Sequence, residues 1–143
     1  MTVKDNCLLD TSALFAYTDG EEGSGLIGRV LEDAEKGKQR VYISAITIME
    51  LYYITHQEIG EEAARELVIL VRSLPVQELP LSEDLILPAG DLKARYRISV
   101  ADAWIGATAK IHSLNLIHKD PEFEPLKEEL LLTELPYKGK RVR

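Results

Sequence analysis

Short apolar runs alternate with longer amphipathic segments along the chain, and this alternation constrains its fold more than any other feature. The apolar runs have the length and composition of buried strands. They are Cys7–Leu9, Val41–Ile43, Val76–Leu79, Leu114–His118 and Leu130–Thr133. Strands separated by helices usually run parallel, because each helix carries the chain back along one face of the sheet. The alternation therefore predicts an α/β domain whose parallel sheet is covered by helices on both faces.

The segments between these runs have helical periodicity. They are Gly25–Lys36, Ala45–Ile59, Glu61–Leu74, Glu83–Tyr96 and Val100–Ser113. Pro88 should kink or split the fourth of them, because proline lacks a backbone N–H and its ring crowds the preceding turn. The 143 residues contain no repeat, low-complexity stretch or linker, and this length suits one domain. We expect that domain at residues 1–135 and a basic tail at 136–143.

The formal net charge of −7 argues against a protein that coats DNA or a membrane surface, since such proteins are usually basic. It does not exclude a nuclease, because acids that hold a metal ion lower the net charge while they create a site for phosphate. Four basic residues lie within 138–143. They can reach RNA phosphates, although a solvated terminus is the more ordinary interpretation.

The single cysteine, Cys7, excludes an internal disulfide and a cysteine-based zinc site within one chain. Its position in an apolar run favours a small buried side chain. No stretch is long and apolar enough to span a membrane, and residues 1–6 do not resemble a signal peptide. We therefore expect the cytoplasm as the compartment.

Two aspartates follow expected strands, where ligands of parallel sheets gather. Asp10 comes directly after Cys7–Leu9, and Asp120 stands two residues after Leu114–His118. Each also has an ordinary structural interpretation. Asp10 suits a helix N-cap, and Asp120 suits a turn before Pro121.

Glu50 lies in an apolar helical segment and shares a face with Ile46 and Ile54. A carboxylate on such a face loses hydration unless a partner compensates for the loss. The segment reads as buried, and it leaves two partners open, an arginine in an ion pair or a bound metal.

Asp102 lies at the start of the helix expected over Val100–Ser113. Together with Ser99 it fits a capping box, in which an acid three residues after a serine closes the start of the helix. The next residues on the same face, Ile105 and Ala109, should be buried. Capping and metal binding are compatible roles for this carboxylate.

All four acids can converge at one edge of the sheet. Crowded carboxylates repel one another, and their pKa values rise unless cations are present. Mg²⁺ and Mn²⁺ prefer oxygen ligands, and Mg²⁺ commonly binds phosphate as well. Such a site can activate a water molecule for in-line attack on a phosphodiester without a histidine base.

Four stretches of the chain resemble, in order, the motifs of the PIN-domain family, and within it the VapC-like toxin ribonucleases of type II toxin–antitoxin pairs. The stretches are 8–14, 46–53, 99–109 and 116–123. No single stretch is diagnostic, but the four in this order span nearly the whole chain. The resemblance implies a three-layer α/β/α fold with a parallel sheet of about five strands, and metal-dependent cleavage of RNA.

The resemblance also assigns roles to individual residues. Asp10, Glu50, Asp102 and Asp120 match the family's acidic quartet, and Thr11 or Ser12 can orient a ligand or water. We expect Asp10 and Asp102 to be the main direct ligands of Mg²⁺ or Mn²⁺. We expect Glu50 and Asp120 to bind directly or through water, with Asp120 on a mobile turn the more suited to water. Family members commonly form homodimers, and the toxins bind a small antitoxin whose tail enters the acidic groove.

The sequence departs from the family at His118, where threonine or serine is common. An imidazole can bind phosphate or a softer metal, but a solvent-facing strand end is the interpretation we favour. Substrate recognition is poorly marked. Lys93, Arg95, Arg97 and Lys119 fit an ordinary solvated face. Three aromatic residues fit core or interface packing better than stacking on a base, namely Tyr52, Tyr53 and Trp104.

Three other functions stay open at the sequence level. A response-regulator receiver needs a phospho-accepting aspartate after its third strand, and Pro80–Glu83 contains none. A PIN-like domain that binds metal or a partner without cleavage is a second. A PIN nuclease that processes RNA instead of acting as a toxin is a third, and only a short neighbouring reading frame would favour the toxin.

Overall fold

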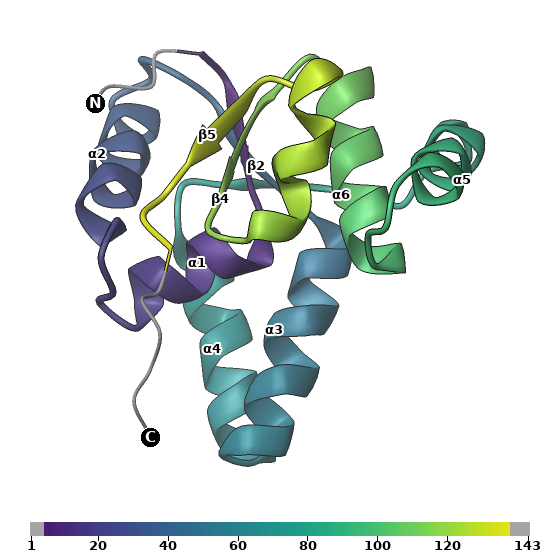
Figure 1. Ribbon diagram of the computed structural model, residues 1–143. Coiled ribbons are helices and arrows are strands. Elements are labelled where there is room, and N and C mark those ends of the chain that lie inside the picture. Colours follow the sequence, from purple (N-terminus) through teal and green to yellow (C-terminus); the bar gives the residue numbers. More distant parts are fainter. Residues whose placement is uncertain (1–4, 138–143) are drawn as a thin grey trace.

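The computed structural model describes residues 5–137 and has a five-stranded parallel sheet between two groups of helices (Figure 1). The strands are β1 (Cys7–Leu9), β2 (Val41–Ser44), β3 (Gln77–Leu79), β4 (Asn115–His118) and β5 (Leu132–Glu134). Their order in the sheet is β3-β2-β1-β4-β5, and every neighbouring pair is parallel. The expected three-layer α/β/α fold is confirmed, and its strand order reverses beside β1.

The central strand β1 is buried on both faces, so each of its residues serves one of two cores. Cys7 and Leu9 pack in the core on the side of α1 (Thr11–Thr18) and α2 (Ser24–Glu35). Leu8 packs in the opposite core, on the side of α5 (Ile86–Arg95) and α6 (Val100–Ile111). The apolar run without alternation is therefore the signature of a strand covered on both sides.

Gly106 lets α6 approach its neighbours closely. A Cβ atom at this position would lie 3.3 Å from the side chains of Leu92 in α5 and Leu126 in the 3₁₀ helix η2 (Pro121–Glu128). Such contacts are tighter than ordinary packing, so a larger residue would require these leucine side chains to shift by a few tenths of an ångström. Because Asp102 lies in the first turn of α6, the packing of this helix also positions the Asp102 carboxylate.

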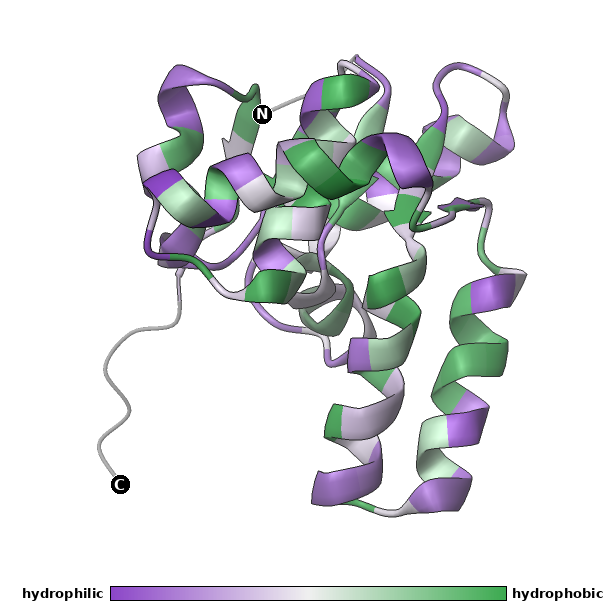
Figure 2. Ribbon diagram, turned by 90° about the vertical axis from the view of Figure 1, so that its right-hand side faces the viewer, coloured by the Kyte–Doolittle hydropathy of each residue, from purple (hydrophilic) through white to green (hydrophobic). Residues whose placement is uncertain are grey.

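Helices α3 (Ala45–Glu58) and α4 (Glu61–Ser73) form a hairpin that runs away from the sheet (Figure 1). Gly60 joins them with a φ of 143°, a conformation that favours glycine. Polar and apolar residues alternate along both helices (Figure 2). The expectation that the whole segment around Glu50 is buried is wrong, because Met49 and Tyr53 are exposed.

The expected helices are present with shifts at their ends. Of two further elements, α1 was anticipated only through the N-cap interpretation of Asp10, and η2 was not predicted. Helix α1 follows β1 directly, and η2 follows β4. The segment 83–96 is split, as its proline suggested. A 3₁₀ turn η1 (Glu83–Leu85) precedes α5, and Pro88 falls in the first turn of α5, where its missing N–H has no helical partner to lose.

The proposed domain boundary falls in a segment that packs on the domain. Leu135 is buried in the core, and Tyr137 is half-buried with its ring 6.3 Å from that of His118. The basic residues of the expected tail, 138–143, lie outside the described residues. None of the helices in residues 5–137 combines the length and apolar character needed to cross a membrane.

Candidate metal centre

All four predicted acids line one cleft of about 240 Å³ at the carboxyl edge of the sheet. Asp10 leaves the end of β1, Asp120 follows β4, and Glu50 and Asp102 come from α3 and α6. The lining residues are Asp10, Thr11, Ser12, Phe15, Glu50, Ile54, Ser99, Asp102, Asp120 and Glu122. The strand-end rule thus located the cleft correctly, while the role of these acids as metal ligands stays a prediction.

Asp10 is buried at the junction of β1 and α1 and is the N-cap of α1. Its Oδ1 accepts a hydrogen bond of 2.8 Å from the Ala13 N–H, and the Ser12 hydroxyl lies 2.8 and 2.7 Å from its two carboxyl oxygens. Burial raises the pKa of Asp10 to about 7, assisted by the nearby charge of Asp120 and opposed by these hydrogen bonds. The capping interpretation is correct, and the carboxylate also faces the cleft.

Glu50 is held by a threonine and not by an arginine. The Thr11 hydroxyl donates to Glu50 Oε1 at 2.6 Å and lies 3.2 Å from the hydroxyl of Thr47. Glu50 is half-buried, and within residues 5–137 no lysine or arginine forms an ion pair with it. Thr11 therefore orients the carboxylate of Glu50, whereas Ser12 orients that of Asp10.

The start of α6 carries a capping arrangement in which one half comes from a distant residue. The Ser99 hydroxyl accepts a hydrogen bond of 3.1 Å from the Asp102 N–H, as a capping box requires. In a capping box the acid of the helix accepts the N–H of the serine in return. Here the Ser99 N–H donates instead to Glu122 Oε1, at 3.0 Å. The Asp102 side chain is thereby left to the cleft, where it is 7% exposed.

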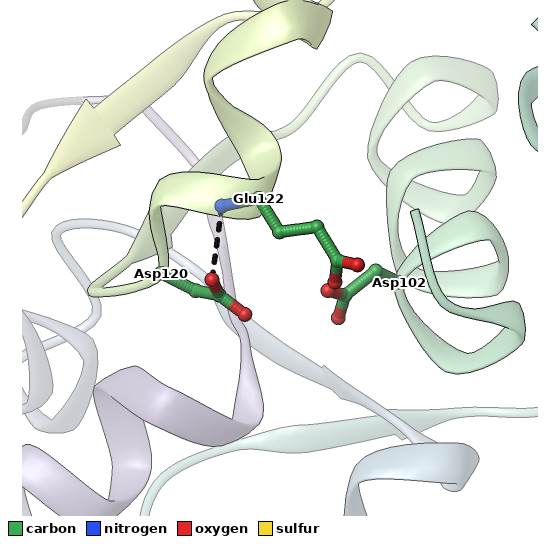
Figure 3. A group of neighbouring side chains, drawn as sticks. All are labelled: Asp102, Asp120 and Glu122. Carbon is green, nitrogen blue, oxygen red and sulfur yellow. Dashed lines mark hydrogen bonds between the residues drawn. The ribbon is translucent and has the colours of Figure 1, made fainter. Parts of the chain in front are cut away.

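Asp102, Asp120 and Glu122 form the tightest group of acids in the described part of the chain. Each offers a carboxylate oxygen, and these oxygens all lie within 4.8 Å of one another. Figure 3 shows the side chains of Asp102 and Glu122 pointing toward each other, with Asp120 beside them. Burial, the contact with Glu122 and the charges of the neighbouring acids hold the pKa of Asp102 well above its usual range.

Glu122 is the site residue that sequence analysis missed. It stands two residues after Asp120 on η2, and its N–H donates to Asp120 Oδ1 at 2.9 Å (Figure 3). A helical turn after Pro121 was the available signal, because proline favours the first turn of a helix. With an ordinary turn expected there, nothing suggested that Glu122 would turn back toward Asp102.

His118 does not face solvent as we expected. It is 1% exposed, its ring packs 5.3 Å from that of Phe123, and its Nδ1 accepts a hydrogen bond of 3.2 Å from the Asp120 N–H. Burial lowers the pKa of His118, which favours the neutral ring, and a neutral ring that accepts at Nδ1 carries its proton on Nε2. The imidazole therefore shapes the turn of Asp120, whose N–H donates to His118 and whose Oδ1 accepts from the Glu122 N–H.

The lysine nearest the site is also not an ordinary surface residue. The side chain of Lys119 is 4% exposed, and its Nζ donates to the Glu22 carbonyl at 2.9 Å. By contrast Lys93, Arg95 and Arg97 are exposed, as expected.

Within residues 5–137, none of the five acids of the cleft is in an ion pair with lysine or arginine. They are Asp10, Glu50, Asp102, Asp120 and Glu122. Five hard oxygen donors without a lysine or arginine counterion in this part of the chain fit Mg²⁺ or Mn²⁺, and the pKa values of two of them, Asp10 and Asp102, are raised. No phospho-accepting aspartate ends β3, which leads into Pro80, so the receiver interpretation has no site.

Comparison with protein families finds one that matches most of the chain. A family model described as PIN domain matches residues 7–129. A search of curated protein sequences gives no match.

Several solved structures share this fold. The chain is similar to a DNA-bound VapBC from Salmonella typhimurium, at 20% identity and a TM-score of 0.73, with 91% of this chain and 98% of that chain covered. It is similar to a toxin-antitoxin complex from Klebsiella pneumoniae, at 25% identity and a TM-score of 0.58, with 83% and 91% covered. A third is VapC20 of Mycobacterium tuberculosis, described as a sarcin-ricin loop cleaving toxin, at 20% identity and a TM-score of 0.65, with 84% and 94% covered.

Proposed function

Because the chain belongs to the PIN domain family, we propose that it is a metal-dependent endoribonuclease and the toxin of a toxin–antitoxin pair. The observation that carries the proposal is the cleft in which five carboxylates meet without a lysine or arginine partner among residues 5–137. A cluster of this kind is unfavourable for the fold alone, since burial and repulsion both oppose its ionised form. A function that requires a cation explains why the cluster is there.

The residues of the cleft divide into those that would hold Mg²⁺ or Mn²⁺ and those that orient them. Asp102, Asp120 and Glu122 have converging oxygens, and Asp10 and Glu50 complete the acidic wall. When bound, the cation supplies charge neutralisation for the phosphodiester and an activated water for its hydrolysis.

The orienting residues act on the carboxylates through hydrogen bonds. Ser12 fixes Asp10, and Thr11 fixes Glu50. The neutral ring of His118 accepts the Asp120 N–H and so sets the turn that presents Asp120. Hydrogen-bond partners of this kind commonly matter for metal sites nearly as much as the ligands themselves.

Cleavage of a labelled single-stranded RNA tests the reaction. The wild-type protein should cleave with Mg²⁺ or Mn²⁺ and should stop when EDTA is added. Asp10→Asn, which keeps the shape of a cleft carboxylate and removes its charge, should abolish cleavage. Asp91→Asn is the matched control, because Asp91 is an exposed aspartate of α5 outside the cleft.

Two outcomes would count against the proposal. Equal metal-dependent cleavage by Asp10→Asn would show that the cleft is not the site. Calorimetric binding of Mg²⁺ by the wild-type protein without cleavage of any RNA in a randomised pool would favour a PIN domain that has lost turnover. Cleavage of single-stranded DNA in place of RNA would correct the substrate and leave the site intact.

The toxin role rests on the resemblance to toxin–antitoxin structures, several of which are complexes. We expect a small antitoxin to bind this chain in the cytoplasm and to block the acidic cleft. Co-purification with the product of a short neighbouring reading frame, together with loss of RNA cleavage in the complex, would support that role. Activity without such a partner would favour RNA processing.

We also propose that two copies of the chain form a homodimer. Apolar side chains are exposed on α5 and at the start of α6, with Leu87 82%, Val100 61% and Ile86 52% exposed. Trp104 lies beside them in a cleft of about 210 Å³. Light scattering should give twice the chain mass, and Leu87→Glu should reduce it to one chain.

A further inference from the structure

A second cavity opens beside the acidic cleft and has a different chemistry. It has a volume of about 370 Å³, within the range of roughly 300–1,000 Å³ that is usual for ligand pockets. Phe15, Ile54 and Tyr137 supply apolar and aromatic surface. Ser12, Phe15 and Ile54 line the acidic cleft as well, so the two cavities adjoin one another. A group attached to a phosphate in the acidic cleft can therefore extend into this neighbour.

The aromatic wall of this cavity is held in place. The Tyr137 hydroxyl donates to Glu124 at 3.0 Å, and its ring lies 6.3 Å from the buried ring of His118. Phe15 projects from α1 at the boundary of both cavities. A flat ring that enters between them would meet surfaces that are already positioned, which lowers the entropy lost on binding.

The charges of the cavity argue against a phosphate. Among the described residues that line it, the only lysine is Lys119, whose Nζ donates to the Glu22 carbonyl at 2.9 Å and lies 3.6 Å from Glu21 Oε1. The lysine is therefore already engaged, and the wall also carries the carboxylate of the exposed residue Glu58. An anionic group would be repelled there, whereas a neutral ring that carries amino groups can donate hydrogen bonds to carboxylates.

We propose that this cavity binds the base of the nucleotide next to the scissile phosphate, and that it prefers bases with an exocyclic amino group over uracil. The proposal rests on the proposed ribonuclease function and adds a specificity site to it. Single-stranded RNA is commonly recognised by unstacked bases that pack on aromatic side chains and hydrogen-bond through their edges. The carboxylate of Glu58 is the acceptor we assign to the amino group, because it lines this cavity but not the acidic cleft.

Abasic scanning tests the proposal by binding as well as by cleavage. A short RNA is prepared with one base removed at each position in turn, and its affinity for the Asp102→Asn protein is measured with Mg²⁺ present. Stacking of one base contributes enough that one abasic position should weaken binding by roughly 10-fold to 100-fold. In the wild-type protein, the same position should lie beside the cut.

Two variants connect that position to the cavity. Adding Tyr137→Leu should reduce the abasic effect to less than about threefold, because the ring that the base contacts is gone. Adding Glu58→Gln should remove the preference against uracil at that position. Tyr53→Leu is the matched control, since Tyr53 is an exposed tyrosine that lines neither cavity, and it should retain the full abasic effect.

The outcomes separate the two proposals. RNA that binds or is cut with no sensitive position, or with the same sensitivity in Tyr137→Leu, overturns the base site. Failure of every RNA to bind also overturns the base site. If Tyr137→Leu weakens only the binding of a protein partner, the cavity is a protein-docking site and the assignment to a base is wrong. Base-sensitive binding without cleavage by the wild-type protein supports the cavity and overturns the proposed reaction alone.

Discussion

Two clusters of charged residues in this molecule shift the pKa of a carboxyl group in opposite directions. In the acidic cleft, Asp102 lies against Glu122 and Asp120 without a cation, and burial and repulsion raise its pKa. On the outer side of α5 and α6, Glu129 receives hydrogen bonds from Arg95 at 2.7 and 2.8 Å and from Lys110 at 2.8 Å. These partners hold the pKa of Glu129 far below its usual range.

The difference separates a carboxylate that stabilises the fold from one that we propose binds a metal ion. Glu129 joins α5, α6 and the end of η2, and the Tyr96 hydroxyl also donates to it. Within residues 5–137 no lysine or arginine forms an ion pair with Asp102, and burial and the neighbouring acids oppose the ionised form of its carboxylate. Charge removal should therefore have opposite consequences at the two places.

The largest expected effect is the loss of activity in Asp102→Asn. Residues that only orient a metal ligand commonly cost about 10-fold to 100-fold when they are changed, so loss of a ligand should reduce RNA cleavage by at least about 100-fold. Glu129→Gln should change cleavage by less than about threefold, a margin typical of sites remote from the chemistry. Initial rates at saturating Mg²⁺ measure both. Comparable losses of cleavage in the two variants would show that Asp102 and Glu129 do not differ in their importance for the reaction.

The next effect is on the stability of the metal-free protein as pH changes. The pKa of Asp10 is about 7 in the folded protein against 3.8 in the unfolded chain, and that of Asp102 is also raised. The folded state then binds more protons than the unfolded state, so stability should fall as pH rises from about 4 through the folded pKa of Asp10 at about 7, and should fall further through that of Asp102 at about 9. Thermal melting in EDTA should show this decline, and it should be shallower in Asp102→Asn.

Mg²⁺ should reverse the decline in the wild-type protein. At a concentration 100 times its Kd, a ligand that binds only the folded state adds about 2.7 kcal/mol. Melts at pH 8 with and without Mg²⁺ measure this gain. In Asp102→Asn, Mg²⁺ should raise the melting temperature less, while the EDTA melt should lie roughly 4 °C above wild type, the shift that about 1 kcal/mol gives in a domain of this size. A variant that is destabilised in EDTA would place Asp102 in the same class as Glu129.

A smaller loss of activity is expected from Thr11→Val. The substitution keeps the shape of Thr11 and removes the hydroxyl that donates to Glu50 at 2.6 Å. Glu50 should keep its charge and lose its orientation, so cleavage should fall by about 10-fold, the lower end of the range for partners of metal ligands. Thr18→Val, on the same helix with its hydroxyl bonded to the Phe15 carbonyl, is the control. An unchanged rate in Thr11→Val would indicate that Glu50 needs no orientation.

The sequence predicted the edge of the sheet at which the acids gather, but not how they are arranged there. Asp10 and Asp120 were located because strand ends are visible as boundaries of apolar runs. Glu122 was not located, because its turn toward Asp102 depends on η2, a 3₁₀ helix with little periodicity of its own.

His118 and Glu129 show a second limit of the sequence. Imidazole is amphipathic, so the apolar run could not show whether the ring of His118 was inside or outside. Glu129 contacts Arg95 across 34 positions of the chain, and no local spacing marks such a pair. Local patterns thus predicted which elements form and where they end, whereas contacts between distant side chains required the fold.

The smallest expected effect is a loss of stability in Glu129→Gln. The amide oxygen can still accept hydrogen bonds from Arg95 and Lys110, but the amide NH₂ cannot accept, so the bonds to the second carboxylate oxygen are lost together with the charge. About 1 kcal/mol is expected at pH 7, because ion pairs of partly exposed side chains contribute little. The ordinary pKa of a glutamate is 4.5, and that of Glu129 is lower in the folded protein. Its contribution is therefore complete above pH 4.5 and diminishes as pH falls further, opposite in sign to the effect of Asp10.

Denaturant melts of wild type and Glu129→Gln measure this contribution. The difference in stability between the two proteins should be present at pH 7 and smaller at pH 3. Glu128→Gln, an exposed neighbour without a partner among the ion pairs of residues 5–137, should match wild type at both. A loss in Glu129→Gln that grows toward acid pH would mean that the two groups of carboxylates do not differ in the way their surroundings indicate.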